Sequence, residues 1–418
     1  MTSTAADSPA STTDTATVQR RILRVLVISQ VLSGAGLAAG ITVGALLAQD
    51  MLGSTSLAGL PSALFTAGSA LAAVVVGRVS QARGRRPGLA IGYLTGALGA
   101  AGVIVAAAWD QPVLLFFFLL VYGAGTATNL QARYAGADLA TPDHRGRAVS
   151  RVLVATTLGG VAGPNLTAPT GSLAETLGLP HLAGPFLLAG AAYALAALAL
   201  TLWLRPDPLL LARELAEEDT PAPTIERNGE PSDVREGRSG VVLGALVMVL
   251  TQLVMVAIMT MTPVHMHDHG HGTAASGLVI ALHVAAMYLP SPLTGWLVDR
   301  YGRMTIAAAS GVTLLAAGVV GAAAPGGSVA LVALALILLG LGWNFGLVSG
   351  TAIITDTVPL AVRAKTQGTV DVSIALAGAT GGMTSGLVVA AAGFPVLALV
   401  GGLLSLALLP AIALTARR

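Results

Sequence analysis

Two pairs of soft metal ligands interrupt apolar stretches in the second half of this 418-residue chain. Met255 and Met259 form one pair, and His283 and Met287 form the other. On a helix, a spacing of four residues places both members of a pair on one face, with their Cβ atoms about 6 Å apart. Thioether sulfur and imidazole nitrogen are ligands that copper favours, and thioether selects Cu(I) over hard cations. The four residues therefore predict a copper site.

Core packing is the alternative explanation, because methionine is a common packing residue in helical bundles. Met255 and Met259 taken alone fit that alternative. A histidine inside a membrane span is rarer and indicates a functional site by default. His283 therefore favours metal binding over packing.

A short segment between the two pairs is also rich in ligands. It reads His265-Met266-His267-Asp268-His269-Gly270-His271 and holds four of the seven histidines of the chain. A flexible loop of this composition can gather copper at an entrance. The alternative is a hydrophilic loop that binds metal only incidentally. The candidates for accessory metal capture are His265, Met266, His267, His269 and His271.

The elements that position these residues are membrane-spanning helices. The chain is 54% hydrophobic and 10% charged, which excludes a soluble globule. Apolar runs of 18 or more residues recur along its length, and a barrel strand would need only about 10. We predict an all-α integral membrane protein with twelve transmembrane helices. The predicted spans are 22–48, 55–77, 87–108, 112–133, 148–170, 182–204, 241–263, 276–297, 304–323, 328–350, 366–391 and 394–415.

Charge location predicts the orientation of these spans. All 22 Lys and Arg residues fall on one side of a twelve-span arrangement. By the positive-inside rule that side is the cytoplasm, with both termini inside. The basic residues are thus topology residues in a lipid bilayer and do not indicate nucleic-acid binding. The absence of cysteine excludes disulfides and thiolate metal sites. Composition favours a bacterial source, and we expect the cytoplasmic membrane.

The chain divides into two similar halves. Residues 1–19 predict a disordered cytoplasmic tail, 20–204 one six-helix bundle, 205–240 a cytoplasmic linker, and 241–418 a second six-helix bundle. Adding 218 converts positions in the first bundle into equivalent positions in the second. The pairs related in this way are Gly77 and Gly295, Gly84 and Gly302, Arg85 and Arg303, Asp138 and Asp356, and Arg145 and Arg363.

The loop after the eighth span, Gly295-Trp-Leu-Val-Asp299-Arg300-Tyr-Gly302-Arg303, resembles the signature of the major facilitator superfamily. The first half departs from it, since Gln81 stands where the acidic residue belongs. The resemblance implies a transporter with alternating access and a substrate site between the halves. Ion pairs around these loops would act as a gate, and tight turning is the alternative role. The gate candidates are Asp138, Arg145, Asp299, Arg300, Arg303, Asp356 and Arg363.

The ligand pairs extend the resemblance. Met-x-x-x-Met in the seventh span followed by His-x-x-x-Met in the eighth is similar to the CcoA-like copper importer branch of that superfamily. The resemblance implies that Met255, Met259, His283 and Met287 bind imported copper, as Cu(I), which a cytoplasmic copper chaperone could receive. Related members of the branch are linked to other cargo, including riboflavin.

Copper would be cargo, with no prosthetic group and no enzymatic activity, and we expect a monomer. No nucleotide-binding loop is visible, so protons or the membrane potential would drive uptake. Asp371 and His283 are the candidates for proton coupling. Two other functions remain open. One is a carrier of an organic solute or drug, for uptake or efflux, and the other is a metal sensor that does not transport. The carrier would use a polar pocket with Asn129, Gln131, Asn165 and Asn344 as candidates.

Overall fold

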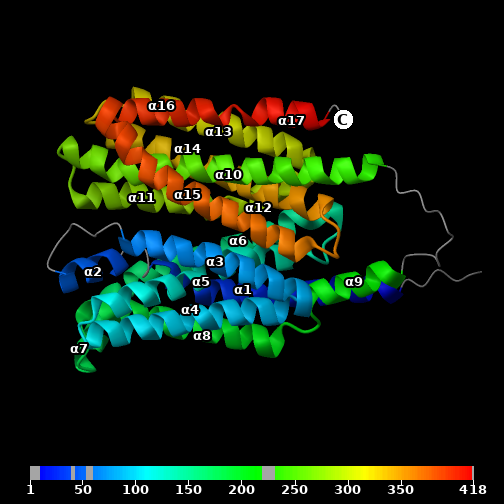
Figure 1. The fold of residues 1–418 in the computed structure, drawn as a ribbon. Helices are drawn as coiled ribbons and strands as arrows, with labels where there is room; N and C mark the ends of the chain where they lie inside the picture. The colour runs from blue at the N-terminus through cyan, green and yellow to red at the C-terminus, as the bar shows by residue number, and fades with distance from the viewer. Residues whose placement is uncertain (1–9, 39–42, 53–59, 219–230, 417–418) are drawn as a thin grey trace, which may run out of the picture.

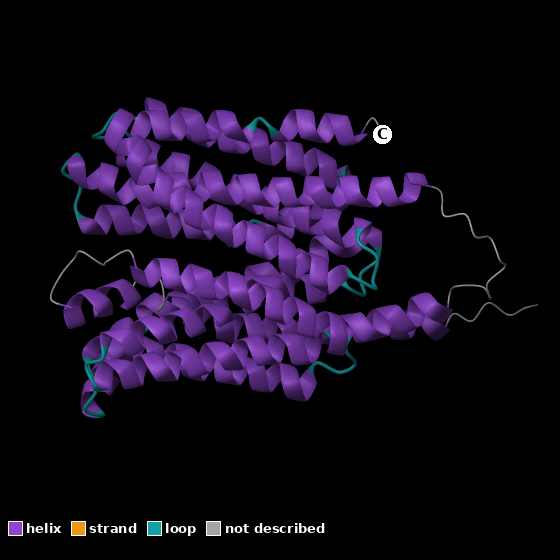
Figure 2. Cartoon of the chain, in the orientation of Figure 1, coloured by secondary structure: helices purple, strands orange, loops and turns teal. Residues whose placement is uncertain are grey.

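The computed structural model describes residues 10–38, 43–52, 60–218 and 231–416, and every regular element in these ranges is helical (Figure 2). Short turns join most of the helices. The helices of the first half are α1 (Ala10–Ala38), α2 (Gly44–Leu52), α3 (Leu60–Arg83), α4 (Arg85–Ala108), α5 (Pro112–Ala137), η2 (Pro142–His144), α6 (Arg145–Asn165), α7 (Thr167–Thr176), η3 (His181–Ala183), α8 (Gly184–Trp203) and α9 (Pro208–Glu218). Those of the second half are α10 (Pro231–Asp268), α11 (Thr273–Tyr288), α12 (Ser291–Tyr301), α13 (Arg303–Ala323), α14 (Val329–Thr357), α15 (Arg363–Ala392), α16 (Phe394–Ser405) and α17 (Leu408–Ala416).

Ten helical segments among the described residues are long and apolar enough to cross a membrane. They correspond to all the predicted spans except the first and the fifth, where α1 and α6 lie. These two helices carry buried polar side chains, including Gln30 and Ser33 on α1 and Ser150 and Thr156 on α6, which lower their apolar character. The all-helical fold is as predicted, whereas the count of twelve and the orientation of the termini stay predictions.

The helices form two bundles that lie side by side (Figure 1). One bundle contains α1 to α8 and the other contains α10 to α17. Across the boundary, α3 packs against α15 and α6 packs against α12. Glycines allow the first of these approaches: a Cβ added to Gly77 would lie 3.0 Å from the Cα of Gly368. The two contacts form the seams at which the halves meet.

Two boundaries differ from the sequence prediction. The first helix begins at Ala10, so residues 10–19 are helical rather than a disordered tail, and residues 1–9 lie outside the described ranges. The linker 205–240 contains α9, and α10 begins inside it at Pro231. Asp207 explains why α9 forms there: its carboxylate accepts hydrogen bonds from the backbone N–H groups of Leu209 and Leu210 and from that of Arg86 on α4. The first part of the linker is therefore anchored to the first bundle.

The eighth predicted span is a broken helix. It consists of α11 and α12, which are separated at Leu289 and Pro290. Proline has no backbone N–H, so Pro290 and Pro292 each remove a helical hydrogen bond at this point. Broken helices in transporters are tolerated where neighbouring groups satisfy the freed backbone, and they often mark binding sites.

Candidate functional site

Asn344 of α14 bridges the break between α11 and α12. Its side-chain nitrogen donates to the carbonyl of Met287 and to the hydroxyl of Ser291, both at 2.7 Å. Its side-chain oxygen accepts from the hydroxyl of Thr294 at 2.5 Å. The nitrogen and the oxygen of this buried amide thus both hold the two helix segments against α14. Met287 therefore sits at a fixed position beside the break.

His283 lies one turn before Met287 and is fully buried. Its Nδ1 lies 2.8 Å from the carbonyl oxygen of Leu336 on α14. A carbonyl can only accept, so Nδ1 carries the proton and the neutral ring presents the lone pair of Nε2. Nε2 is buried and has no hydrogen-bond partner among the described residues. Metal-binding histidines usually have this arrangement, with one nitrogen donating to a backbone carbonyl and the other facing the metal.

The methionine pair on α10 reaches the same level of the bundle. The helices α10 and α14 pack against each other, with Gln252 of α10 beside Trp343 of α14. The indole nitrogen of Trp343 donates to the Gln252 side chain at 2.7 Å. Met255, one turn further along α10, therefore lies at about the level of Gly340. α14 contacts α11 at this level as well, because a Cβ added to Gly340 would lie 3.1 Å from the backbone nitrogen of Met287. The structure thus places both ligand pairs at one height around α14.

The four ligands are not joined into a closed cage. Met255 and Met287 are buried in the same core cluster, and Met259 packs against it partly buried. No hydrogen bond among the described residues joins one pair to the other, and α10 and α11 make few contacts with each other. The arrangement is an apolar layer with one unpartnered imidazole nitrogen.

The histidine-rich segment differs from the flexible loop that the sequence predicted. Residues 265–268 form the last turn of α10, and Met266 is buried in the core. The ring of His265 stacks on Phe394 and lies 4.4 Å from the ring of His269, measured between centroids. His271 bonds through Nε2 to the Gly326 carbonyl at 2.8 Å, while His267 is exposed. Within the described ranges, no three His, Asp or Glu residues converge on a possible metal position.

The two seams are closed by equivalent contacts. At one seam, Oε1 of Gln81 on α3 accepts from the backbone N–H groups of Ala364 and Lys365 at the start of α15, at 2.8 and 3.3 Å. At the other, the carboxylate of Asp299 on α12 accepts from the N–H groups of Gly146 and Arg147 at the start of α6, at 2.8 and 3.1 Å. Adding 218 to each N-half number gives its C-half equivalent. Gln81 therefore makes the same helix cap as Asp299, without the charge.

Most of the predicted gate residues form ion pairs. Arg85 binds Asp138 at 2.8 Å within the first half, and the equivalent Arg303 binds Asp356 in the second. Arg145 reaches across the halves to Asp356. Asp299 pairs with Arg147 at 3.4 Å.

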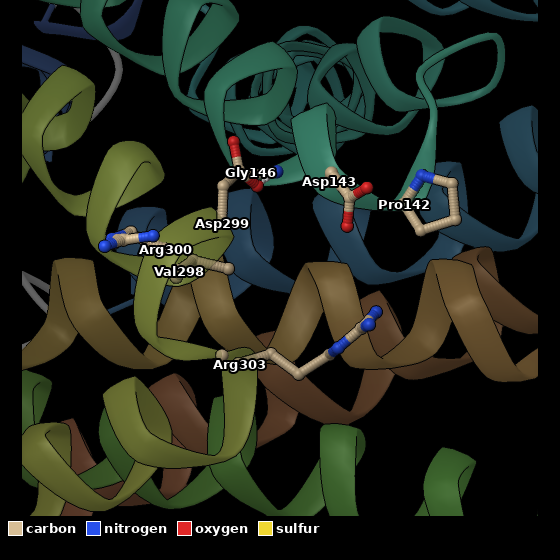
Figure 3. Close-up of a pocket in the computed structure, with 8 residues that line it drawn as sticks. Pro142, Asp143, Gly146, Val298, Asp299, Arg300 and Arg303 are labelled. Carbon is tan, nitrogen blue, oxygen red and sulfur yellow. Dashed lines mark hydrogen bonds between the residues drawn. The ribbon is translucent and has the colours of Figure 1, made fainter.

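Arg363 and Arg300 differ from the other gate candidates. Arg363 donates to the Val358 carbonyl at 3.1 Å and forms no ion pair with the described residues. Arg300 lines a polar pocket of about 290 Å³ beside Asp299 (Figure 3).

A buried ion pair between Arg133 and Asp371 was missed by the sequence reasoning, which treated Arg133 as a topology residue. Nη2 of Arg133 on α5 lies 2.8 Å from Oδ1 of Asp371 on α15, and the Tyr134 hydroxyl donates to the same oxygen at 3.1 Å. Nε of Arg133 donates to the Thr351 hydroxyl at 3.0 Å. Because α5 and α15 belong to different halves, this pair joins them. Arg133 and Thr351 occupy equivalent positions in the two halves, since adding 218 to 133 gives 351, but this offset does not indicate the pairing with Asp371.

The predicted polar pocket is mostly occupied by structural hydrogen bonds. Asn129 donates to Ser33 at 2.8 Å, Gln131 donates to the Ala73 carbonyl at 2.8 Å, and Asn344 holds the helix break. Asn165 ends α6. Two aromatic residues lie next to Gln252. Tyr288 and Trp343 pack edge to face with ring centroids 5.7 Å apart, and Trp343 is hydrogen-bonded to Gln252.

The comparisons place this chain among known transporters. Residues 26–345 and 244–418 match the family model described as Major Facilitator Superfamily. The chain is 57% identical to the uncharacterized MFS-type transporter YdeG of Bacillus subtilis, over 94% of this chain and 91% of that protein. It is 34% identical to the riboflavin transporter RfnT of Brucella anthropi, over 85% and 86% of the two chains. The solved structure of the proton:xylose symporter XylE aligns with a TM-score of 0.75 at 17% identity, covering 96% of each chain.

Proposed function

The chain belongs to the Major Facilitator Superfamily and is a multi-pass membrane transporter, and from this premise we propose that its cargo is copper, imported as Cu(I). Alternating access between the two halves would carry the ion across the bacterial cytoplasmic membrane. The ligands would be His283, Met287, Met255 and Met259.

The observation that carries this proposal is the unpartnered Nε2 of His283. A polar nitrogen that is buried without a hydrogen bond costs free energy, typically about 1–3 kcal/mol. A bound metal ion removes that cost, and the Nδ1–H bond to the Leu336 carbonyl already fixes the tautomer that can bind it. The other ligand candidates are neutral thioethers, which can be buried in the membrane without the cost of a carboxylate. This donor set fits a soft monovalent ion.

A second candidate cargo is an organic solute such as a flavin. The specific observation in its favour is the aromatic pair Tyr288 and Trp343 beside Gln252, at the same level as the ligand pairs. A planar heterocycle can stack on such a pair and bond to the amide. The relative RfnT, named a riboflavin transporter, agrees with this candidate.

Uptake into proteoliposomes distinguishes these cargoes. We expect the wild-type protein to accumulate Cu(I), and Met255→Ala and His283→Ala each to abolish the accumulation. Met383→Ala is the matched control, because Met383 is 76% exposed and belongs to neither ligand pair. Riboflavin uptake by the wild type that Trp343→Ala removes, with copper uptake absent, would replace the copper assignment by the flavin one.

Metal binding without flux would instead support the sensor hypothesis. Equal copper uptake by the wild type and by both ligand variants would also overturn the proposal. Size-exclusion profiles and thermal melting of every variant show whether a loss of uptake reflects unfolding. A proton on Asp371 or His283, or the membrane potential, would supply the driving force in the proposed cycle, and a cytoplasmic chaperone would accept the ion.

A further inference from the structure

A groove of about 550 Å³ lies between α1 and α6 and is also lined by Leu289 of the second half. The two helices run in the same direction, since Gln30 pairs with Thr156 and Gly34 lies beside Gly159. Arg20 and Arg24 of α1 and Arg151 of α6 therefore lie at the same end of the groove. The complete lining is Arg20, Leu23, Arg24, Val27, Arg151, Val154, Ala155, Thr157, Leu158 and Leu289.

The charged end of the groove has three guanidinium groups and no acidic residue in its lining. Arg24 and Arg151 form no ion pair or hydrogen bond with the described residues, and Arg20 donates only to the nearby Thr17 hydroxyl at 3.0 Å. Arg20 and Arg24 are four residues apart, so they lie on one face of α1. Three cations without a counter-charge favour an anionic ligand, and a phosphate group matches the guanidinium fork best.

The rest of the groove is mostly apolar, and part of its lining is exposed. Leu158 is 66% exposed and Leu289 is 57% exposed. Thr157 is only 7% exposed, and its hydroxyl is buried without a hydrogen-bond partner in the described part of the chain. It lies six residues beyond Arg151, which is about 9 Å along the helix. An unpartnered hydroxyl at that depth needs an acceptor that the protein does not provide.

We propose that this groove binds an anionic phospholipid. The phosphate lies against Arg24, Arg151 and Arg20, an ester oxygen accepts from the Thr157 hydroxyl, and an acyl chain follows the apolar lining. A free anion leaves the apolar part and the Thr157 hydroxyl unused. Because Leu289 lies at the break between α11 and α12, the bound lipid touches both halves and favours the conformation described here. The proposal is independent of the cargo.

Native mass spectrometry of the detergent-purified protein tests this site. Phosphatidylglycerol should bind at least tenfold more tightly than phosphatidylcholine, because the choline cation opposes the arginines. Each arginine near an anionic lipid contributes about 1 kcal/mol, or about fivefold, so Arg24→Gln/Arg151→Gln should weaken phosphatidylglycerol binding roughly thirtyfold. Arg24→Lys/Arg151→Lys should stay within about threefold of the wild type, since the charge is retained. Arg83→Gln is the matched control, an exposed arginine at the end of α3, and should have no effect.

Three results would overturn the proposal. One is equal binding of the two lipids, and another is unchanged phosphatidylglycerol binding by the doubly neutralised variant. The third is full competition by soluble glycerol phosphate at the same concentration as the lipid, which would show a simple anion site. If the double variant does not fold, the single change Arg151→Gln at an exposed position should still cost about fivefold.

Discussion

Replacing Asp371 by Asn should release the closed seam between α3 and α15. The substitution keeps the size and shape of the side chain and removes its charge. Arg133 would then remain fully buried, with its Tyr134, Thr351 and backbone contacts but without its counter-ion. An arginine in this position stays charged, so its burial becomes the dominant cost. When the halves separate, water can reach the guanidinium and the cost falls.

The size of the effect follows from the burial of the pair. The Arg133 side chain is 0% exposed and the Asp371 side chain is 3% exposed. Removing one partner of such a pair costs about 3–5 kcal/mol, because the remaining charge is uncompensated. If only the closed conformation bears this cost, the ratio of closed to open molecules should fall by roughly a hundredfold to a few thousandfold. The double variant Arg133→Gln/Asp371→Asn should recover most of the loss, since no buried charge remains.

The assay is electron paramagnetic resonance measurement of the distance between two spin labels, one on each side of the seam. The natural sequence has no cysteine, so spin labels on introduced cysteines report only the chosen positions. Ala82 at the end of α3 and Ala361 before α15 are both exposed and lie on the two sides of the seam. The wild type should give a short distance, Asp371→Asn a population at longer distance, and the double variant a distribution near that of the wild type.

A matched control separates charge loss at the seam from amide substitution in general. Glu175→Gln removes a carboxylate that pairs with His181 at 3.0 Å, but both side chains are about half exposed. It should leave the distance unchanged, as exposed pairs contribute about 0–1 kcal/mol. Unchanged distances in Asp371→Asn, or a double variant as open as the single one, would refute the reasoning from burial.

Three further substitutions test the helix break, the seam between α6 and α12, and the turn between α12 and α13. Asn344→Leu should lower the free energy of unfolding by about 1–3 kcal/mol, because the Met287 carbonyl loses its buried donor; thermal melting that matches the wild type would contradict this role. Asp299→Asn should destabilise the closed seam between α6 and α12 by about 0.3–1 kcal/mol, measured by spin-label distances, because the cap on the first turn of α6 loses its charge. Gly302→Ala should lower the free energy of unfolding by about 1–2 kcal/mol, because Gly302 has a φ of 90°, which disfavours a residue with a Cβ atom. Gly327→Ala is the control and should melt like the wild type.

The architecture was accessible from the sequence because hydropathy and charge act over whole segments. Ten of the predicted spans appear as apolar helices, and the repeat offset of 218 reappears as two equivalent seams. The boundaries near residues 10 and 231 were less accessible, because the composition around them is polar. The first and fifth spans are the weakest apolar signals, since their polar side chains bond to each other in the core.

The site was only partly accessible from the sequence. Helical spacing placed Met255 and His283 correctly in apolar helices, and the structure adds the unpartnered nitrogen. The cargo stays a prediction that no contact described here tests. Spacing gave no indication of the Arg133–Asp371 pair, because its partners are 238 residues apart. Residues 265–268 extend α10, since Met266 packs into the core and the adjacent His265 ring stacks on Phe394, which composition alone does not reveal.

The two helix caps that cross between the halves have a consequence for the role of solvent. When a seam opens, the first-turn N–H groups of α15 or α6 lose their acceptors on Gln81 or Asp299. Water must enter to replace those acceptors, because leaving backbone donors dry inside a membrane protein costs several kcal/mol each. Opening is then a hydration reaction as well as a rotation of two bundles. Excluded osmolytes on that side of the membrane should favour the closed form, so the transport cycle would depend on water activity.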